Sequence, residues 1–398
     1  MTAVHRHIRH TGALVASAFL LGAAPASAQL TVRLSVPRNT PPGATIYLAG
    51  SFNGWNPASL AYRLTREASG EYAITLHEDV RGPVDFKFTL GSWDAAESDS
   101  TGADAPNRRF VVPATGAATY AGSVAGWRDG SPRPARPSTA SRSVTVLDTA
   151  FAIPQLGRTR RVWIYLPPDY ATTTKTYPVL YMHDAQNVFD DATSYAGEWG
   201  VDETLDSLHA AGDWGAIVVA VDNGGQRRLD EYSPWTHPRH GGGEGDAYVD
   251  FLANTLKPYI DARYRTRPDR LNTGVAGSSM GGLISLYAAL KHPDVFGRAG
   301  VFSPAFWFSQ QNFAYARAAR PLGGERFYMV TGAREGDAPQ VYENDHRRMV
   351  DTLAAAGFRV GRQVVGYVRE DGTHSEGFWR REFPAAYRWM FGGGTDCP

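Results

Sequence analysis

Hydrophobic and polar residues alternate in short stretches through the first third of the chain. Four stretches follow this two-residue period and are separated by Gly, Pro, Asn and Asp: residues 45–55 (TIYLAGSFNGW), 71–80 (EYAITLHEDV), 83–91 (PVDFKFTLG) and 107–113 (NRRFVVP). Alternation gives each strand one apolar face, and short strands with frequent turn residues are typical of a β-sandwich. We therefore expect residues 29–125 to form a small immunoglobulin-like β-sandwich.

The pattern changes after residue 143, where apolar strands alternate with amphipathic helices. Residues 247–260 and 281–291 repeat apolar side chains at helical spacing. Seven stretches predict strands, several of them apolar throughout and therefore suited to burial on both faces: residues 160–168, 177–184, 215–223, 271–278, 298–304, 326–332 and 363–368. This alternation predicts that residues 143–398 form an α/β domain, with a mostly parallel sheet and helices on both faces.

Two further segments set the limits of these domains. Residues 126–142 (GWRDGSPRPARPSTASR) are rich in Pro, Gly, Ser and Arg and lack apolar periodicity, which predicts an extended linker. At the N-terminus, two arginines precede an apolar run, residues 12–24, and an Ala-Ser-Ala sequence follows just before Gln29. The run is too short to span a bilayer, so residues 1–28 are predicted to be a signal peptide. The mature chain would then be secreted or periplasmic, without a membrane span.

The overall charge narrows the range of partners. The 398 residues include 40 Lys and Arg and 40 Asp and Glu. No global field would attract nucleic acid or an anionic membrane, and we expect no nucleic-acid partner. The sole cysteine, Cys397, cannot form an intrachain disulfide or a zinc cluster. We expect neither a metal nor an organic cofactor.

One short motif carries candidate chemistry. Ser279 is the third residue of a G-x-S-x-G sequence that follows a predicted strand and precedes a predicted helix, as a nucleophile elbow requires. The alternative interpretation is that Ser279 only caps the helix. A nucleophilic serine needs an acid and then a histidine later in the chain. Glu335 follows a late predicted strand, with Asp337 as the alternative acid, and His374 follows the last strand.

The oxyanion of such a reaction needs backbone N–H donors. The amide of Met280, directly after the serine, is one, and the second is expected after an early strand, at Gln186 or its neighbour Ala185. The sequence HGGG at residues 240–243 mimics a lipase oxyanion motif but occurs two strands too late. We interpret it as a flexible flap.

Several of these segments together resemble the Putative esterase family of α/β hydrolases, which includes feruloyl, acetyl-xylan and enterochelin esterases. They are residues 179–190 (VLYMHDAQNVFD), 222–235 (DNGGQRRLDEYSPW), 276–282 (AGSSMGG) and 371–379 (DGTHSEGFW). The resemblance covers residues 144–391 and implies an α/β-hydrolase fold. It also implies Ser279 as nucleophile, His374 as base, Glu335 as acid, and the Met280 and Gln186 amides as oxyanion donors.

The N-terminal part resembles the starch- and glycogen-binding carbohydrate modules. The similar segments are residues 45–57 (TIYLAGSFNGWNP), 86–93 (FKFTLGSW) and 105–112 (APNRRFVV). The resemblance implies sugar-contacting positions at Trp55, Lys87, Trp93 and Asn107. Indole faces stack on sugar rings, and Lys and Asn bond hydroxyl groups. The alternative is that both tryptophans belong to the core of the sandwich.

These observations predict a secreted or periplasmic serine carboxylesterase. It would hydrolyse acyl or aryl esters, those of carbohydrates first, through an acyl-enzyme. Two alternatives stay open: a siderophore trilactone esterase, and a non-catalytic carbohydrate-binding protein on a hydrolase scaffold. Acyl transfer to another alcohol is open as well, because the covalent intermediate is the same.

Overall fold

A computed structural model of the protein describes residues 2, 29–76, 80–100, 102, 105–128, 137–195, 197–336 and 339–392. The predicted signal peptide, apart from residue 2, lies outside this part of the chain, and so do linker residues 129–136. Asp337, the alternative acid, and Cys397 also lie outside the described residues.

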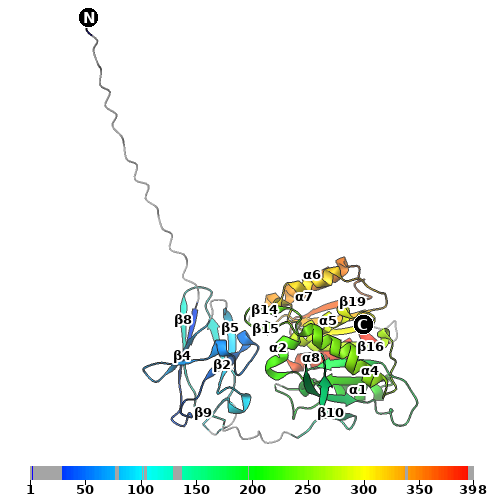
Figure 1. The fold of residues 1–398 in the computed structure, drawn as a ribbon, viewed down its shortest axis with the longest axis horizontal. Helices are drawn as coiled ribbons and strands as arrows, with labels where there is room; N and C mark the ends of the chain where they lie inside the picture. Colours follow the sequence, from blue (N-terminus) through cyan, green and yellow to red (C-terminus); the bar gives the residue numbers. More distant parts are fainter. Residues whose placement is uncertain are drawn as a thin grey trace.

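The N-terminal part folds into small sheets around one apolar core (Figure 1). A four-stranded sheet has the order β3 (Thr65–Arg66), β4 (Tyr72–Thr75), β1 (Gln29–Ser35) and β8 (Ala117–Ser123). The other sheets contain β2 (Tyr47–Gly50), β5 (Gly82–Thr89) and β7 (Arg108–Val112), and a pair of β6 (Glu97–Ser98) and β9 (Gly126–Trp127). In β1, buried Leu30, Val32 and Leu34 alternate with more exposed residues, which places one face of the strand on the core.

The second part is built on an eight-stranded sheet. Its strands, in spatial order, are β10 (Val144–Ile153), β11 (Arg158–Tyr165), β13 (Ile217–Val221), β12 (Val179–His183), β16 (Thr273–Ser278), β17 (Arg298–Phe302), β18 (Arg326–Gly332) and β19 (Val364–Arg369). All pairs from β13 to β19 are parallel, and β11 runs antiparallel to β10 and β13. The seven predicted strands are confirmed. β10 lies outside that prediction because it is a largely exposed, bulged edge strand without clean alternation.

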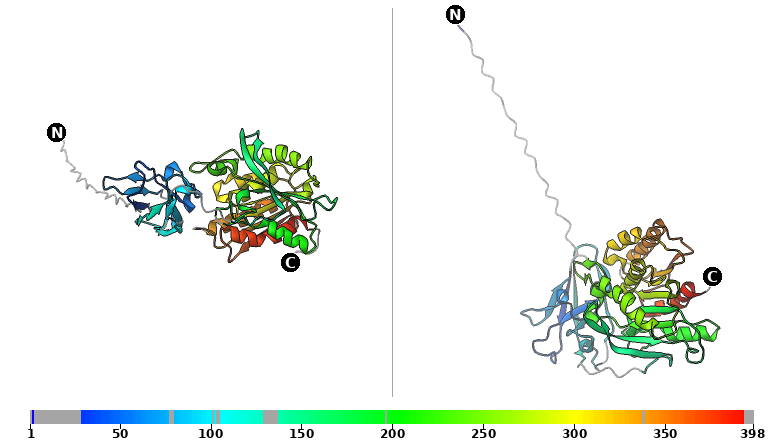
Figure 2. Two further views of the ribbon diagram at one scale, coloured as in Figure 1. Left: turned by 90° about the horizontal axis from the view of Figure 1, so that it is seen from below. Right: turned by 45° about the vertical axis from the view of Figure 1, so that its right-hand side comes forward.

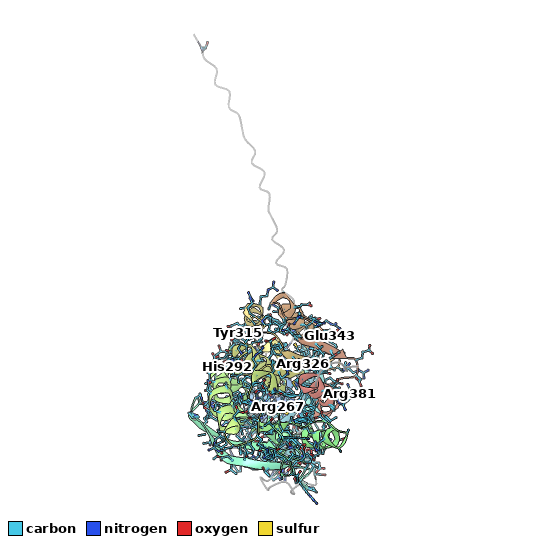
Figure 3. The ribbon with its side chains drawn as sticks, turned by 90° about the vertical axis from the view of Figure 1, so that its right-hand side faces the viewer. Arg267, His292, Tyr315, Arg326, Glu343 and Arg381 are labelled. Atoms are coloured by element: carbon cyan, nitrogen blue, oxygen red, sulfur yellow. The ribbon has the colours of Figure 1, made fainter. Side chains whose placement is uncertain are left out.

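Helices cover both faces of this sheet. α1 (Val201–Ala210) and α8 (Glu376–Phe391) share an apolar cluster with one face. The cluster on the other face includes α3 (Gly245–Phe251), the π-helical turn η6 (Leu252–Leu256), α4 (Lys257–Asp261), α5 (Met280–Lys291), α6 (Gln311–Ala318) and α7 (Pro339–Ala355). At one end of the layer, Arg326 donates to the carbonyl oxygens of Trp389 (3.1 Å) and Gly392 (2.7 Å), which caps α8 (Figure 3).

The strand order reverses at β12, which lies between β13 and β16. At such a point the connections leave toward opposite faces of a parallel sheet and open a crevice at the carboxyl ends of the strands. The segments that follow β12 and β16 contain Gln186 and Ser279. Both segments therefore start side by side at this edge of the sheet.

The N-terminal part lies against the segment that follows β13 (Figures 1 and 2). A Cβ atom at Gly54 would lie 3.6 Å from Cδ1 of Leu229, which belongs to the short helix α2 (Arg228–Glu231). The end of the linker is bound to the second part, because Ser141 N–H donates to Asp202 Oδ2 at 2.7 Å. The N-terminal part thus lies beside a loop at the carboxyl ends of the sheet.

Candidate active site

Ser279 occupies a sharp turn between β16 and α5. Its backbone has φ 58° and ψ −120°, a conformation that costs energy for a residue with a side chain and is found mostly at functional sites. Although Ser279 is the N-cap of α5, its side chain makes no capping hydrogen bond. The hydroxyl is partly exposed between buried neighbours. The Ser279 side chain therefore does not cap α5.

The glycines of the motif allow this turn to form. A Cβ atom at Gly277 would lie 2.9 Å from Cδ2 of His183 and 3.0 Å from the carbonyl carbon of Gly281. Contacts that short do not occur in folded proteins without movement of the neighbouring atoms. A side chain at this position would therefore push the elbow away from β12.

Glu335 and His374 form a hydrogen-bonded pair. The distance from His374 Nδ1 to Glu335 Oε2 is 3.0 Å, and Glu335 is fully buried. The other oxygen of Glu335 accepts hydrogen bonds from Gly332 N–H at 2.6 Å and from the hydroxyl of Ser303. An ionised carboxylate can only accept hydrogen bonds, so Glu335 in that form favours the His374 tautomer with a proton on Nδ1.

Two residues that sequence reasoning did not identify support this pair. Trp379 Nε1–H donates to Ser303 Oγ at 2.8 Å, and the Ser303 hydroxyl donates in turn to Glu335. The Trp379 ring also meets the His374 ring edge-on, with centroids 5.1 Å apart. Ser303 directly follows β17, so its place at the end of a predicted strand beside the nucleophile strand was a usable signal.

The candidate residues converge because their strands are neighbours. Ser279, Ser303, Glu335 and His374 follow β16, β17, β18 and β19, which are adjacent in the sheet. The backbone ties the first two turns together, since Ser279 N–H donates to Phe302 O at 2.9 Å. Within the described part of the chain, Nε2 of His374 has no hydrogen bond, which leaves it available to a serine hydroxyl.

Backbone amides at this edge can hold a negative oxygen. The N–H of Met280 is the first in α5, and the first amides of a helix lack intrahelical acceptors. The amides of Ala185 and Gln186 begin the short helix η4 (Ala185–Asn187) directly after β12. The Gln186 side chain is held separately, because its Oε1 accepts from Asn223 N–H at 3.2 Å. The structure therefore brings both predicted donor segments to the switch point of the sheet.

All the candidate active-site residues lie in a part of the chain that matches a known protein family. Residues 153–390, which are more than half of the chain, match the family described as Putative esterase. The chain belongs to this esterase family. Its second part is accordingly an α/β-hydrolase domain, and membership supports an ester hydrolase activity.

Three relatives are similar to this chain, and the similarity covers only part of the length of each relative. An endo-1,4-beta-xylanase/feruloyl esterase of Xylanibacter ruminicola is 25% identical over 231 residues, which are 56% of this chain and 28% of that protein. An iron(III) enterobactin esterase of Dickeya dadantii is 28% identical over 296 residues, which are 67% of this chain and 59% of that protein. An alpha-amylase of Niallia circulans is 46% identical over 110 residues, which are 28% of this chain and 8% of that protein.

A buried ion pair holds the segment that follows β12 and contains Ala185 and Gln186. Asp184, in the left-handed conformation with φ 57°, accepts two hydrogen bonds from the Arg228 guanidinium, at 2.7 and 2.8 Å. Asn223 Nδ2 donates to the same carboxylate at 2.7 Å. Burial opposes ionisation of Asp184, but the guanidinium outweighs it and holds the pKa of that carboxyl below its usual value. The pair therefore fixes the turn that presents the Ala185 and Gln186 amides.

Aromatic side chains from other segments lie near the His374 ring. The Tyr342 ring lies 5.2 Å from the His374 ring, and Trp307 Nε1–H donates to the Tyr342 hydroxyl at 3.1 Å. Trp307 is 37% exposed, so part of the indole is open to a ligand. His240, from the HGGG sequence, lies 5.8 Å from the Trp307 ring. These rings form an apolar wall beside the candidate base.

The HGGG sequence belongs to a two-stranded hairpin of β14 (Thr236–His237) and β15 (Gly241–Gly242). Gly242 N–H donates to Asp230 Oδ1 at 2.9 Å, and Gly243 N–H donates to Ser233 O at 2.8 Å. These bonds tie the hairpin to the segment that also contains Arg228. The hairpin is thus a wall of the site, and its Gly242 and Gly243 amides are engaged elsewhere than with an oxyanion.

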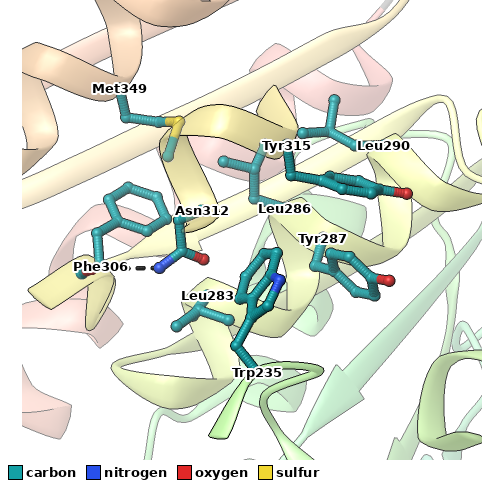
Figure 4. Close-up of a pocket in the computed structure, with 9 residues that line it drawn as sticks. All are labelled: Trp235, Leu283, Leu286, Tyr287, Leu290, Phe306, Asn312, Tyr315 and Met349. Carbon is teal, nitrogen blue, oxygen red and sulfur yellow. Dashed lines mark hydrogen bonds between the residues drawn. The ribbon is translucent and has the colours of Figure 1, made fainter. Parts of the chain in front are cut away.

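One small cavity lies beside α5 but not at the candidate triad (Figure 4). Its volume is about 10 Å³, room for one water-sized sphere, and apolar side chains such as Leu286 and Met349 line it. The polar Asn312 amide there is satisfied by Phe306 O at 3.2 Å. The cavity is a packing defect and too small for an acyl group.

The four candidate sugar-contacting residues lie in different environments. Trp55 and Trp93 are both partly exposed, with ring centroids 6.2 Å apart. Asn107 is exposed, whereas Lys87 is buried at 6% exposure in β5. The two indoles therefore form a pair that a sugar ring can reach, while Lys87 offers little free surface.

The described residues contain neither a membrane-spanning helix nor a cluster of metal ligands. No helix there is both long and apolar enough to cross a membrane. No group of three or more His, Cys, Asp or Glu side chains there could hold a metal ion.

Proposed function

We propose that the protein is a serine carboxylesterase that acts through an acyl-enzyme. Ser279 attacks the ester carbonyl while His374 takes its proton, and Glu335 stabilises the resulting imidazolium. The amides of Met280 and Gln186 bind the oxyanion of the tetrahedral intermediate. The imidazolium then gives its proton to the leaving alcohol, and the same base activates water for deacylation. The observation that carries this proposal is a strained, uncapped Ser279 at the same edge of the sheet as a hydrogen-bonded Glu335–His374 pair.

We further propose that the substrate is an acyl or aryl ester of a carbohydrate. The N-terminal resemblance to carbohydrate modules, the partly exposed Trp55–Trp93 pair and the similarity to an alpha-amylase support a glycan partner. The relative named as a xylanase and feruloyl esterase supports esters of such glycans. The aromatic wall formed by Trp307 and Tyr342 suits an aryl acyl group. A secreted or periplasmic location, which the predicted signal peptide supports, would bring the enzyme to such polymers.

A siderophore trilactone is the second candidate substrate. The relative named as an iron(III) enterobactin esterase, which matches 67% of this chain, favours it. A trilactone also presents aromatic catechol rings, which the same wall could accommodate. Comparison of feruloylated and acetylated sugars with a cyclic catechol trilactone, by kcat/KM, separates the two candidates.

The esterase proposal itself is tested with p-nitrophenyl acetate. Wild-type protein and Ser279→Ala are compared at equal concentration after thermal unfolding has shown that both are folded. Turnover in the wild type and its loss in the variant support the proposal. Equal rates, or no turnover in either, would instead favour the non-catalytic carbohydrate-binding alternative. Product analysis with a sugar acceptor present distinguishes hydrolysis from acyl transfer.

A further inference from the structure

Glu376 lies at the first position of α8, two residues after His374. The helix is capped by Ser375, whose Oγ accepts from Phe378 N–H at 3.4 Å, so the Glu376 carboxylate is not needed as a cap. The side chain is partly exposed. Its position next to the candidate base therefore requires another explanation.

A side-chain hydrogen bond joins the Glu376 carboxylate to Asn187, which belongs to η4. Asn187 Nδ2 donates to Glu376 Oε1 at 3.3 Å, a long hydrogen bond. The charges of His374, Asp184 and Arg228 all act on the pKa of Glu376. Arg228 donates hydrogen bonds from Nε and from one terminal nitrogen to Asp184. Among the described residues, no ion pair joins Arg228 to Glu376. A carboxylate has about four acceptor positions, so Glu376 can accept further hydrogen bonds beside those from Asn187 and from its own backbone.

The chemistry of the reaction places the alcohol half of the ester beside this group. The leaving oxygen must receive a proton from His374, so it has to lie within hydrogen-bonding reach of that ring. Hydroxyl groups on carbons next to the leaving oxygen would then fall near the residues around the ring. Tyr342 and Trp379 contact the ring, and Glu376, two residues after His374 in the chain, is bonded to Asn187.

We propose that Glu376 accepts hydrogen bonds from hydroxyl groups of the substrate's alcohol, with Asn187 beside it, and thereby makes the site selective for esters of polyols. This inference rests on the proposed serine esterase function. Burial raises the pKa of Glu376, while His374 and Arg228 oppose that rise. A hydroxyl donor relieves the cost of a desolvated carboxylate without bringing a second cation next to Arg228.

The test compares two esters that differ only in hydroxyl groups, glycerol monoacetate and propyl acetate. We expect Glu376→Leu to lower the ratio of their kcat/KM values at least tenfold, mainly through KM for the glycerol ester. Glu376→Gln, which keeps an acceptor oxygen but loses the charge, should lose less. The matched control is Glu370→Leu, because Glu370 is an exposed acid in the loop that precedes α8 and should leave the ratio unchanged.

Each other outcome has a separate meaning. Intact turnover with an unchanged ratio in Glu376→Leu overturns the inference and leaves the esterase proposal standing. A larger loss with acetylcholine than with glycerol monoacetate would instead assign the carboxylate to a cationic alcohol and overturn it as well. If wild-type protein hydrolyses neither ester, the proposed function fails and the role of Glu376 falls with it.

Discussion

Removing the Arg228 guanidinium is expected to slow the esterase without greatly weakening substrate binding. Arg228 makes two short bonds to Asp184, and Asp184 sets the turn that begins η4. In Arg228→Ala the Asp184 carboxylate, which is 8% exposed, keeps its bond from Asn223 but loses the opposite charge. The turn can then relax and displace the Gln186 amide from the oxyanion.

The expected magnitudes follow from burial. Breaking a fully buried ion pair costs about 3–5 kcal/mol. The Arg228 side chain is 24% exposed, so water can replace part of the lost interaction, and we expect a loss of about 2 kcal/mol in unfolding free energy. Complete loss of one oxyanion donor lowers kcat about 10²- to 10³-fold. A displaced amide should cost less, so we expect a fall in kcat of about 10- to 100-fold with KM within about threefold.

The assay is steady-state hydrolysis of p-nitrophenyl acetate, with thermal unfolding measured in parallel. Arg227→Ala is the matched control, since Arg227 is adjacent, 61% exposed and paired with Asp230 at 3.3 Å. Arg228→Lys should recover part of kcat, because an ammonium keeps the charge but cannot make the paired bonds of a guanidinium. The reasoning is refuted if Arg228→Ala loses stability yet keeps the wild-type kcat, or if Arg227→Ala loses as much activity.

Three further predictions address the acid, the pH dependence of stability and the glycan partner. Glu335→Gln should lower kcat about 10³-fold or more, because an amide can hold the wrong tautomer of His374; a rate near wild type would remove Glu335 from the mechanism. Burial lowers the pKa of His346 to about 4 in the folded state, below its ordinary value of 6.5. The free energy of unfolding should therefore be unaffected by this group above pH 6.5 and should fall by up to about 3 kcal/mol as the pH drops toward 4. Urea titrations at pH 7 and pH 4.5 should therefore show a smaller difference in His346→Leu than in wild type, and an equal difference would contradict this assignment. Trp55→Ala should abolish retention by soluble starch in affinity electrophoresis while leaving p-nitrophenyl acetate hydrolysis intact, and unchanged retention would count against a sugar-binding indole pair.

Much of the fold could be predicted because it depends on local periodicity. The strands of the large sheet are buried apolar runs, and α5 repeats its apolar residues at helical spacing. β10 escaped prediction because an exposed, bulged edge strand has no such pattern. In the N-terminal part, β1 and β8 lie outside the predicted stretches although β1 alternates cleanly.

The candidate site was predictable only where chain order carries the information. Ser279, Glu335 and His374 follow from the order of an elbow, an acid and a histidine, and the structure brings Glu335 to His374. The bond from Trp379 to Ser303 joins residues 76 positions apart, and the Arg228–Asp184 pair spans 44. Such contacts depend on how strands and helices pack, which periodicity does not encode.

Covalent labelling of the nucleophile tests the central claim most directly. Purified mature protein would be treated with a fluorophosphonate, digested and mapped by mass spectrometry, beside Ser279→Ala and His374→Ala. The account predicts a single adduct on Ser279, its absence in the serine variant and labelling slowed at least about 10²-fold in the histidine variant. An adduct on another residue, or equal labelling in Ser279→Ala, would contradict it.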